Sequence, residues 1–506
     1  MALTVTDEIC DGKPRLLVNW SKTKRNQVQE YYEPNDRAEI QRIIQINQGR
    51  KIRLLGSNMS PNGIGPGSNK GIALSTIRLN QILDLDGNNQ LVRVEPGVKI
   101  EQLLEFLAKS KLTLHNLPST NGMTIAGLVQ TSCHGTGLHL ATLEEALTEI
   151  KVINAKGDEV ILTEANNGIL FHSAKCSLGT FGVIVELTLK CVPSYYLRET
   201  LKVMSLPEAR SDHEQRIETI KHVKYHHLPY TGHVVVYEYQ EISHADYLEQ
   251  VASSNVPIAP EEQKASLLQM YYDSFKTDLN HSTYCEFVEE YKAKSFADLR
   301  EALLRKDVLN PDHIKAVNHA ELDFWKKSQH SIVDQSNKRL IFECGGRQHV
   351  REFAFPIEAP MQELDLVDEI LDLIQTQRIP APVPIEQRWS CGSQSLLSPV
   401  YAETNPATSK FSWVGIIMYL TKNEDLNRRI SEAFEAYYGQ IVETLGAKYQ
   451  LDEHLAKIGT IEGQNEGFMR YRSNRLSSRL KRFNQQREEF DPQGMFLSEA
   501  AAEILQ

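Results

Sequence analysis

The sequence lacks long hydrophobic runs and an excess of basic residues. Its longest apolar run, FSWVGIIMYL (Phe411–Leu420), has about ten residues, whereas a bilayer-spanning helix needs about 20, so we expect no transmembrane segment. Lys and Arg number 55 against 66 Asp and Glu, which gives a net charge of −11 over 506 residues. That balance argues against a nucleic-acid binder with a basic face, and the length is sufficient for two or three domains.

Paired cysteines and a targeting segment are also missing. The seven cysteines form no CxxC pair, and an odd, dispersed set is typical of free thiols in a reducing compartment. We therefore expect neither disulfides nor a metal site. The first residues, MALTVTDEICDGKPR, have no apolar signal core and are too acidic for a typical transit peptide. From this we expect either a cytoplasmic protein or a chain whose leader has been removed.

Periodicity over the first 195 residues predicts short strands and single helices. Apolar residues recur at helical spacing over Arg37–Gln48 and Lys99–Lys111. Hairpins are predicted with turns at Asp86–Asn89 and Lys156–Gly157, and Gly179–Pro193 predicts a buried strand closed by proline. Because these elements do not form a βαβ series, the expected fold class is α+β rather than a doubly wound parallel sheet.

Two loops combine glycine with small polar residues: GSNMSPNGIGPG (Gly56–Gly67) and SCHGTG (Ser132–Gly137). Small residues let a ligand approach the backbone closely and leave N–H groups free for phosphate oxygens. Neither loop matches the dinucleotide fingerprint or the P-loop, and either one alone is more often an ordinary turn. Together, about 75 residues apart, they suggest a diphosphate held from two sides.

The segments around these loops resemble a known family. Gly56–Ser60, Pro118–Gly137 and Ser177–Pro193 are similar to the FAD-binding domain of the vanillyl-alcohol-oxidase superfamily. Within it the chain resembles the aldonolactone oxidoreductases, and among these the plant L-galactono-1,4-lactone dehydrogenases. Further matches are LLGSNMSPNGIG, PAPVPIEQRWS, FSWVGIIMYL, DEHLAK and FDPQGMFLS, and the similarity runs in one order from about Val18 to Ser498.

The resemblance implies a domain organisation and a cofactor site. Residues 1–193 are expected to form a two-subdomain FAD-binding domain of the PCMH type. Residues 194–506 are expected to form an α+β cap domain with an antiparallel sheet and flanking helices, whose segment from about 445 to 506 returns to the flavin. The residues implied to hold FAD are Gly56, Ser57, Asn58, Met59, Ser60, Pro118, Ser119, Thr124, Gly127, Thr131, His134, Gly135, Thr136, Gly137, Val183, Ile184, His454 and Lys457.

Met59 bears on how the flavin is attached. Covalent members of the family carry a histidine at this position, which bonds to the flavin 8α-methyl group. A methionine thioether cannot form that bond, so the resemblance implies non-covalent FAD. Packing of Met59 on the flavin's dimethylbenzene ring is compatible with the same expectation.

Glu386 and Arg388 are the candidates for substrate chemistry. They are two residues apart, so on a strand both point to one face. From spacing alone, a cross-strand salt bridge on a solvated face competes with an active-site pair. The resemblance places the pair against the substrate, with Arg388 orienting it and stabilising reduced flavin and Glu386 recognising a hydroxyl. Which group, if any, is the base stays open.

Three further residues enter through the resemblance. Lys457, in HLAK, is expected to place positive charge near the flavin pyrimidine, although Leu455 replaces the family's tryptophan in that motif. Ser119 aligns with a serine that touches substrate, and an ordinary turn serine is the alternative. Cys344 matches an oxidation-sensitive cysteine near the substrate, while a buried, inert thiol is the competing interpretation.

The expected function is FAD-dependent oxidation of an aldono-1,4-lactone to ascorbate or an analogue. L-galactono-, L-gulono- and D-arabinono-lactones all remain candidate substrates. Plant relatives pass electrons to cytochrome c, but Pro118 stands where they carry an alanine thought to block oxygen, so an oxidase that makes hydrogen peroxide is the alternative. The relatives also imply a mitochondrial location and, as a function of another class, a scaffold for assembly of respiratory complex I.

Overall fold

The computed structural model describes residues 12–65, 71–251, 260–275, 288, 291–341, 346–459 and 466–505. Cys344 lies outside these residues, as do positions 66 and 67 of the first glycine loop. Among the helices that the structure describes, none has both the length and the apolar character needed to cross a membrane.

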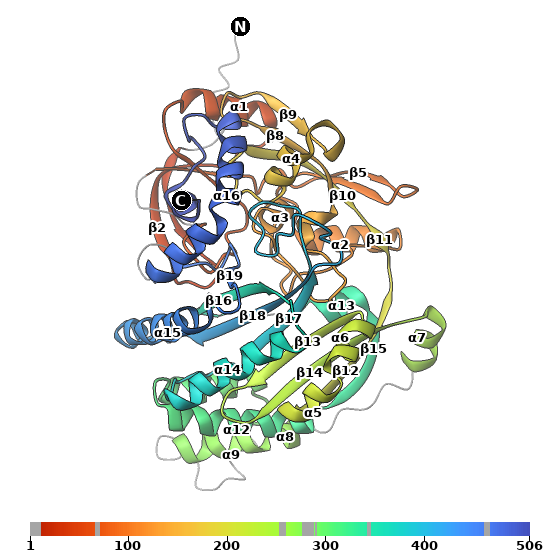
Figure 1. The fold of residues 1–506 in the computed structure, drawn as a ribbon, viewed down its shortest axis with the longest axis vertical. Coiled ribbons are helices and arrows are strands. Elements are labelled where there is room, and N and C mark those ends of the chain that lie inside the picture. Colours follow the sequence, from red (N-terminus) through yellow and green to blue (C-terminus); the bar gives the residue numbers. More distant parts are fainter. Residues whose placement is uncertain are drawn as a thin grey trace.

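Two sheets formed before residue 191 lie in the upper half of Figure 1. The first has the order β1-β2-β4-β3 and combines an antiparallel β1–β2 pair with parallel pairs to β4. Its strands are β1 (Lys13–Val18), β2 (Arg25–Tyr32), β3 (Ile52–Leu55) and β4 (Ile72–Ser75). The second is antiparallel, with the order β5-β6-β10-β8-β9. Its strands are β5 (Ile82–Asp86), β6 (Leu91–Val94), β8 (Leu147–Ile153), β9 (Glu159–Leu162) and β10 (Val183–Lys190).

The predicted helices of this part are present within a few residues of their expected ends. Helix α1 (Arg37–Ile46) begins after Asp36, whose side chain accepts a hydrogen bond from the Glu39 amide and so satisfies a free N–H group. Ile40, Ile43 and Ile44 are buried at the three-to-four-residue spacing of one helix face. The other elements are α2 (Ile100–Lys109), β7 (Leu112–Thr113), α3 (Ile125–Val129), a 3₁₀ turn (Leu143–Ala146), α4 (Glu164–Lys175) and β11 (Val192–Pro193).

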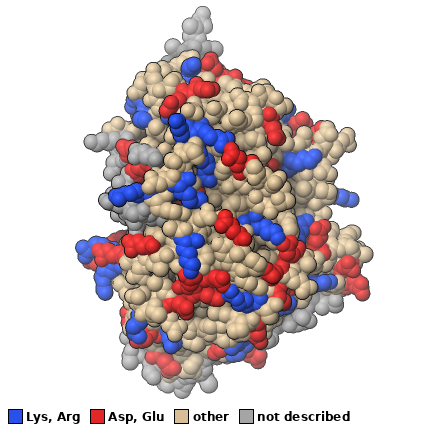
Figure 2. Space-filling model, viewed as in Figure 1, with Lys and Arg blue, Asp and Glu red and all other residues tan. Residues whose placement is uncertain are grey.

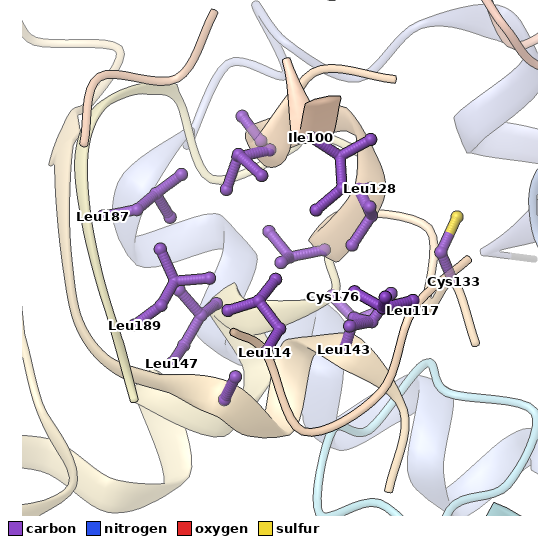
Figure 3. Close-up of a cluster of buried hydrophobic side chains, with 14 of the residues drawn as sticks. Ile100, Leu114, Leu117, Leu128, Cys133, Leu143, Leu147, Cys176, Leu187 and Leu189 are labelled. Carbon is purple, nitrogen blue, oxygen red and sulfur yellow. The ribbon is translucent and has the colours of Figure 1, made fainter. Parts of the chain in front are cut away.

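A hydrophobic core fixes the second glycine loop to this part of the chain (Figure 3). Ile100 and Leu128, from α2 and α3, pack with Leu187 of β10 and are at most 1 % exposed. Burying one such side chain stabilises the fold by about 1.5–3 kcal/mol. Cys133, the second residue of the SCHGTG loop, lies at the edge of the cluster. The core therefore anchors the start of this loop.

The chain after residue 195 forms an antiparallel sheet with the order β15-β12-β14-β13-β17-β18-β16-β19. Its strands are β12 (Tyr196–Ser205), β13 (His222–Leu228), β14 (His233–Ile242), β15 (His330–Gln335), β16 (Gln348–Pro356), β17 (Ile385–Cys391), β18 (Lys410–Tyr419) and β19 (Asp452–Glu453). The fold is therefore α+β, as expected from the sequence.

Alternation along these strands decides which side chains face the site. Phe353 and Phe355 of β16 and Val414 of β18 pack in one core with α14 (Gln362–Thr376) and α15 (Glu424–Leu445). Because strand side chains alternate between faces, Glu352 and Gly415 point to the opposite face. The other helices are α5 (Leu206–Ser211), α6 (His213–Thr219), α7 (His244–Val251), α8 (Pro260–Gln263), α9 (Ala265–Phe275), α11 (Phe296–Lys306), α12 (Pro311–Lys327) and α13 (Ser336–Leu340).

The carboxyl-terminal helices return to the amino-terminal sheets. Helix α16 (Glu466–Phe490) lies beside them in Figure 1 and is followed by α17 (Glu499–Ile504). Phe483 and Phe490 of α16 lie 5.4 Å and 5.5 Å, ring to ring, from Phe181. The Ile52 amide donates to the Met495 carbonyl, so the last segment extends the core of the first sheet.

Candidate active site

A cavity of about 800 Å³ lies between the two glycine loops and the eight-stranded sheet. Most of the residues expected at the site line it. They are Gly56, Ser57, Asn58, Met59, Ser60, Pro118, Ser119, Thr124, Gly127, Thr131, His134, Val183, Ile184, Glu386, Arg388, His454 and Lys457. The sequence therefore brings residues from five separate segments to one space.

The first loop leaves β3 and packs closely on the start of α3. A Cβ atom at Gly56 would collide with Thr124 Oγ1, so the backbone approach requires glycine. The Thr124 amide donates to Ser57 Oγ over 3.2 Å and joins the two segments. Thr124 lines the cavity, and its Oγ1 is buried and has no hydrogen-bond partner within the described residues.

The second loop contributes less than expected. Thr131 and His134 line the cavity, whereas Gly135, Thr136 and Gly137 are absent from its lining. Thr136 Oγ1 donates to a carbonyl of β13, and the Gly137 amide donates to the Trp389 carbonyl of β17 over 2.9 Å. Thr136 and Gly137 attach the loop to the large sheet through these bonds, whereas Gly135 packs against Asn116 and the Leu117 carbonyl.

Two carboxylates and a glycine form the floor of the cavity. Gly415 of β18 is paired with Glu386 of β17 on one side and with Glu352 of β16 on the other. A side chain at position 415 would stand between the two carboxylates, so the glycine keeps the space above the sheet open. Sequence reasoning identified Glu386 but not Glu352.

Arg388 connects Ser119 to this floor. Its NH1 group donates to Ser119 Oγ over 3.1 Å. Its NH2 group lies 2.7 Å from Glu352 Oε1 and 3.3 Å from Glu386 Oε2. The Arg388 side chain is 6 % exposed, so a planar guanidinium is held between two carboxylates in a poorly solvated setting. The alternative interpretation of Glu386 and Arg388 as a salt bridge on a solvated face is therefore wrong.

Glu352 contacts three basic side chains of the site. Besides Arg388, its carboxylate contacts Lys457 Nζ and lies 3.2 Å from His134 Nε2. Burial opposes ionisation of Glu352, but Lys457, Arg388 and His134 outweigh it and hold the pKa of this carboxyl well below its usual range. Ionised Glu352 therefore fixes two cations from distant parts of the chain at the cavity.

His134 and His454 are neutral members of the same cluster. His134 stacks on Trp413 with ring centroids 3.7 Å apart, and burial lowers its pKa to about 4, with Arg388 adding to the effect. Burial also lowers the pKa of His454 well below its usual range. His134, Glu352 and His454 have the spacing of metal ligands. Glu352, however, is already bound to Arg388 and Lys457, which compete with a cation.

Leu455 fills the place of the family's tryptophan without leaving a gap. It is fully buried in the main core. Asn62 Nδ2 donates to the Leu455 carbonyl over 3.0 Å and to the Ile458 carbonyl over 3.1 Å, which ties the HLAK turn to the first glycine loop. The substitution therefore leaves Lys457 positioned at the cavity.

Polar residues of β13 also line the cavity and were not identified from the sequence. His226 and Lys224 of β13 lie beside Glu386, with His226 Nε2 3.5 Å from Glu386 Oε1. Burial opposes ionisation of Glu386, but Arg388, His226 and Lys224 keep its pKa well below the usual range. The available signal was the run KYHHL, in which charged and imidazole groups interrupt a strand.

Family comparisons agree with this geometry. The model of the FAD binding domain matches residues 28–163, and that of D-arabinono-1,4-lactone oxidase matches residues 187–504. The chain belongs to the FAD-dependent aldonolactone oxidoreductases. As a member of that family it is a flavin-dependent lactone oxidoreductase.

Several relatives match this aldonolactone oxidoreductase along nearly its whole length. The mitochondrial L-galactono-1,4-lactone dehydrogenase of Brassica oleracea is 34 % identical over 488 residues, covering 94 % of this chain and 80 % of the relative. The corresponding protein of Arabidopsis thaliana is 32 % identical over 493 residues, covering 94 % and 78 %. L-gulonolactone oxidase of Scyliorhinus torazame is 25 % identical over 484 residues, covering 95 % and 96 %.

A solved structure shares the fold. Cholesterol oxidase from B. sterolicum superposes with a TM-score of 0.74 at 14 % identity, covering 98 % of this chain and 97 % of that one.

The side chains that line the cavity of the aldonolactone oxidoreductase are compatible with bound FAD. Thr124 Oγ1 is a buried hydroxyl with no hydrogen-bond partner within the described residues, and Arg388 and Lys457 supply positive charge. Bound FAD supplies a hydride acceptor.

Proposed function

We propose that this enzyme oxidises an aldono-1,4-lactone at the alcohol carbon next to the carbonyl, giving ascorbate or an analogue, and that L-galactono-1,4-lactone is its main substrate. The observation that carries the proposal is the placement of Glu386 and Arg388 over one cavity with Ser119. A sugar lactone offers several hydroxyls and a carbonyl, which an ionised carboxylate and a guanidinium bind in complementary ways.

The chain's own residues divide the work in this proposal. Glu386 accepts a hydrogen bond from a substrate hydroxyl, and Arg388 donates to the lactone and orients it. Arg388 and Lys457 both supply positive charge where negative charge gathers when bound flavin is reduced. The loop Gly56–Ser60, with Thr124 and Thr131, holds the diphosphate part of FAD, and Val183 and Ile184 lie beside its adenine.

We further propose that FAD is bound non-covalently. Met59 supports this, because it lines the cavity where covalent family members have a histidine and a thioether cannot make the same link. We propose that residues 1–193 form the FAD-binding domain and residues 194–506 the cap domain, with the boundary at the end of β11.

The electron acceptor is proposed to be cytochrome c, with oxygen as the alternative. Similarity to dehydrogenases supports cytochrome c, whereas Pro118, a buried residue of the cavity lining, supports oxygen access.

The proposed location is mitochondrial, which the names of the relatives support, and a cytoplasmic location is the alternative. Association with respiratory complex I is a proposal that rests on resemblance alone.

The test is a steady-state panel of L-galactono-, L-gulono- and D-arabinono-1,4-lactones, each with cytochrome c and with oxygen. We expect the highest kcat/KM for L-galactono-1,4-lactone with cytochrome c. Activity confined to another lactone would change the substrate assignment, and rapid hydrogen peroxide production would make the enzyme an oxidase. No turnover of any lactone would refute the proposed function.

A further inference from the structure

Oxidation of an alcohol also releases its hydroxyl proton, and this inference rests on the proposed function. The two carboxylates of the cavity floor are weak proton acceptors. Cationic neighbours hold the pKa of both Glu386 and Glu352 well below the usual range, despite their burial. An efficient general base has a pKa near the working pH. Another group of the cavity is therefore better suited to take the proton.

His226 is placed for that task by the sheet. It lies on β13 directly opposite Glu386 of β17 in the antiparallel register. Both side chains line the cavity, and each retains 19 % of its side-chain surface. The neighbouring His227 faces the other way, where its Nε2 lies 2.9 Å from Gln387 Oε1 in the protein interior.

The contact with Glu386 selects one protonation state of the imidazole. His226 Nε2 lies 3.5 Å from Glu386 Oε1, and an ionised carboxylate accepts hydrogen bonds but cannot donate them. We assign the imidazole proton to Nε2, on the side of the carboxylate, which leaves the lone pair of Nδ1 as the acceptor. Within the described residues, no hydrogen bond to Nδ1 uses that lone pair.

The groups around His226 keep its imidazole neutral near neutral pH. Burial and the ammonium of Lys224 on the same strand lower its pKa, while Glu386 from β17 and Glu321 from α12 act in the opposite direction. The ring of Tyr237 from β14 packs edge-on at 5.0 Å. The net pKa lies below the ordinary value of 6.5.

We propose that His226 is a catalytic residue that accepts the substrate's hydroxyl proton at Nδ1, and that Glu386 orients its imidazole. In this step the O–H bond of the substrate breaks and an N–H bond forms on His226. The alcohol carbon loses a hydride to bound FAD, so the substrate loses two electrons and two hydrogens and becomes a ketone. The imidazolium is stabilised by the adjacent Glu386 carboxylate, as in other histidine–carboxylate pairs.

The experiment is stopped-flow reduction of the FAD-loaded enzyme by lactone without oxygen, from about pH 5 to 9, in the wild type and His226→Gln. A glutamine can still donate to Glu386 but cannot take up a proton. We expect flavin reduction to slow by about 10²–10⁴-fold, the range of general-base catalysis. The wild-type rate should fall at acidic pH as the imidazole becomes protonated, and this limb should vanish in His226→Gln.

Chemical rescue and a neighbouring variant separate catalysis from structure. Added imidazole should restore part of the rate of His226→Ala, which a merely structural role would not produce. Flavin content, melting temperature and the Kd of a lactone analogue without the reactive hydroxyl should stay near wild type. His227→Gln, on the opposite face of the strand, should keep the acidic limb.

Each result decides the matter. A His226→Gln rate within about threefold of wild type, or an unchanged acidic limb, would overturn the role of His226 while leaving the proposed function intact. Reduction of the wild type by none of the lactones would instead remove the proposed function, and this inference with it.

Discussion

Glu352 and Glu386 lie on either side of Gly415 in one cross-strand row, and Arg388 contacts both carboxylates. One face of the sheet packs against α14 and α15, and the opposite face presents these charged groups to the cavity. The strands alternate, so phenylalanines and valines anchor the rear while the carboxylates face the cavity.

Removing the carboxylate of Glu352 should destabilise the protein. Glu352→Ala leaves Arg388 and Lys457 without a counter-charge in a buried setting, and breaking such a pair lowers the free energy of unfolding by about 3–5 kcal/mol. Urea denaturation measures the loss. Glu403→Ala, which breaks an exposed pair with Arg482, is the control and should cost less than about 1 kcal/mol. Equal losses in the two variants would contradict the role of Glu352.

Enlarging Gly415 should affect substrate binding more than folding. The nearest atoms to an added Cβ are 3.7 Å away or farther, an ordinary contact, so Gly415→Ala should fold normally. Gly415→Val adds bulk between the two carboxylates and should raise the KM for lactone about tenfold or more. At Gly392 the Cβ would lie 2.9 Å from Ala402 Cβ, so Gly392→Ala should instead lower the melting temperature. An unchanged KM in Gly415→Val would exclude the cavity floor as the lactone site.

The flavin should be released when the enzyme is denatured. Met59 offers no nitrogen for a bond to the flavin 8α-methyl group, so acid precipitation should leave a colourless pellet and a yellow supernatant. Absorbance of the two fractions measures this directly. A yellow pellet that survives washing would show a covalent link through another residue.

Glu453 should make stability decline as pH rises. Burial raises its pKa to about 7, so between about pH 4.5 and 7 the folded state holds a proton that the unfolded state has released. Stability contributed by that proton is present at acidic pH and lost as pH rises through the folded pKa. Glu453→Gln should flatten the fall in melting temperature over this range, whereas the exposed Glu105→Gln should not. A steep fall retained in Glu453→Gln would contradict this assignment.

Side chains of both charge signs are present on the surface of this aldonolactone oxidoreductase. Over the face shown in Figure 2, acidic and basic side chains are interspersed.

Local periodicity predicted α1, α2 and two hairpins of the first 195 residues, and α1 and α2 each bury one regular apolar face. It did not predict α3 or α4. It predicted Arg37–Gln48 as a helix, and the structure has Arg37–Ile46, which ends slightly earlier. It also predicted that Glu386 and Arg388 share one face, since strand geometry is local. The position of that face was not local information and came from the family resemblance.

The sequence alone could not place Glu352 and His226 beside their partners, because these contacts depend on strand register. Glu352 meets Arg388 only through the order β17-β18-β16, and His226 meets Glu386 only through the β13–β17 pairing. For the SCHGTG loop, the sequence suggested a ligand contact for residues that do not line the cavity. Its glycines suggested phosphate contact, but Gly137 approaches the large sheet, and a Cβ there would lie 2.6 Å from the Lys221 carbonyl.

The most direct test of the account is anaerobic mixing of the FAD-loaded enzyme with L-galactono-1,4-lactone, followed by the visible absorbance of oxidised flavin. The wild type should lose that absorbance in a single turnover. Arg388→Ala should retain FAD but be reduced at least about 100-fold more slowly. Reduction of Arg388→Ala at the wild-type rate, or no reduction of the wild type by any aldonolactone, would contradict the central claim.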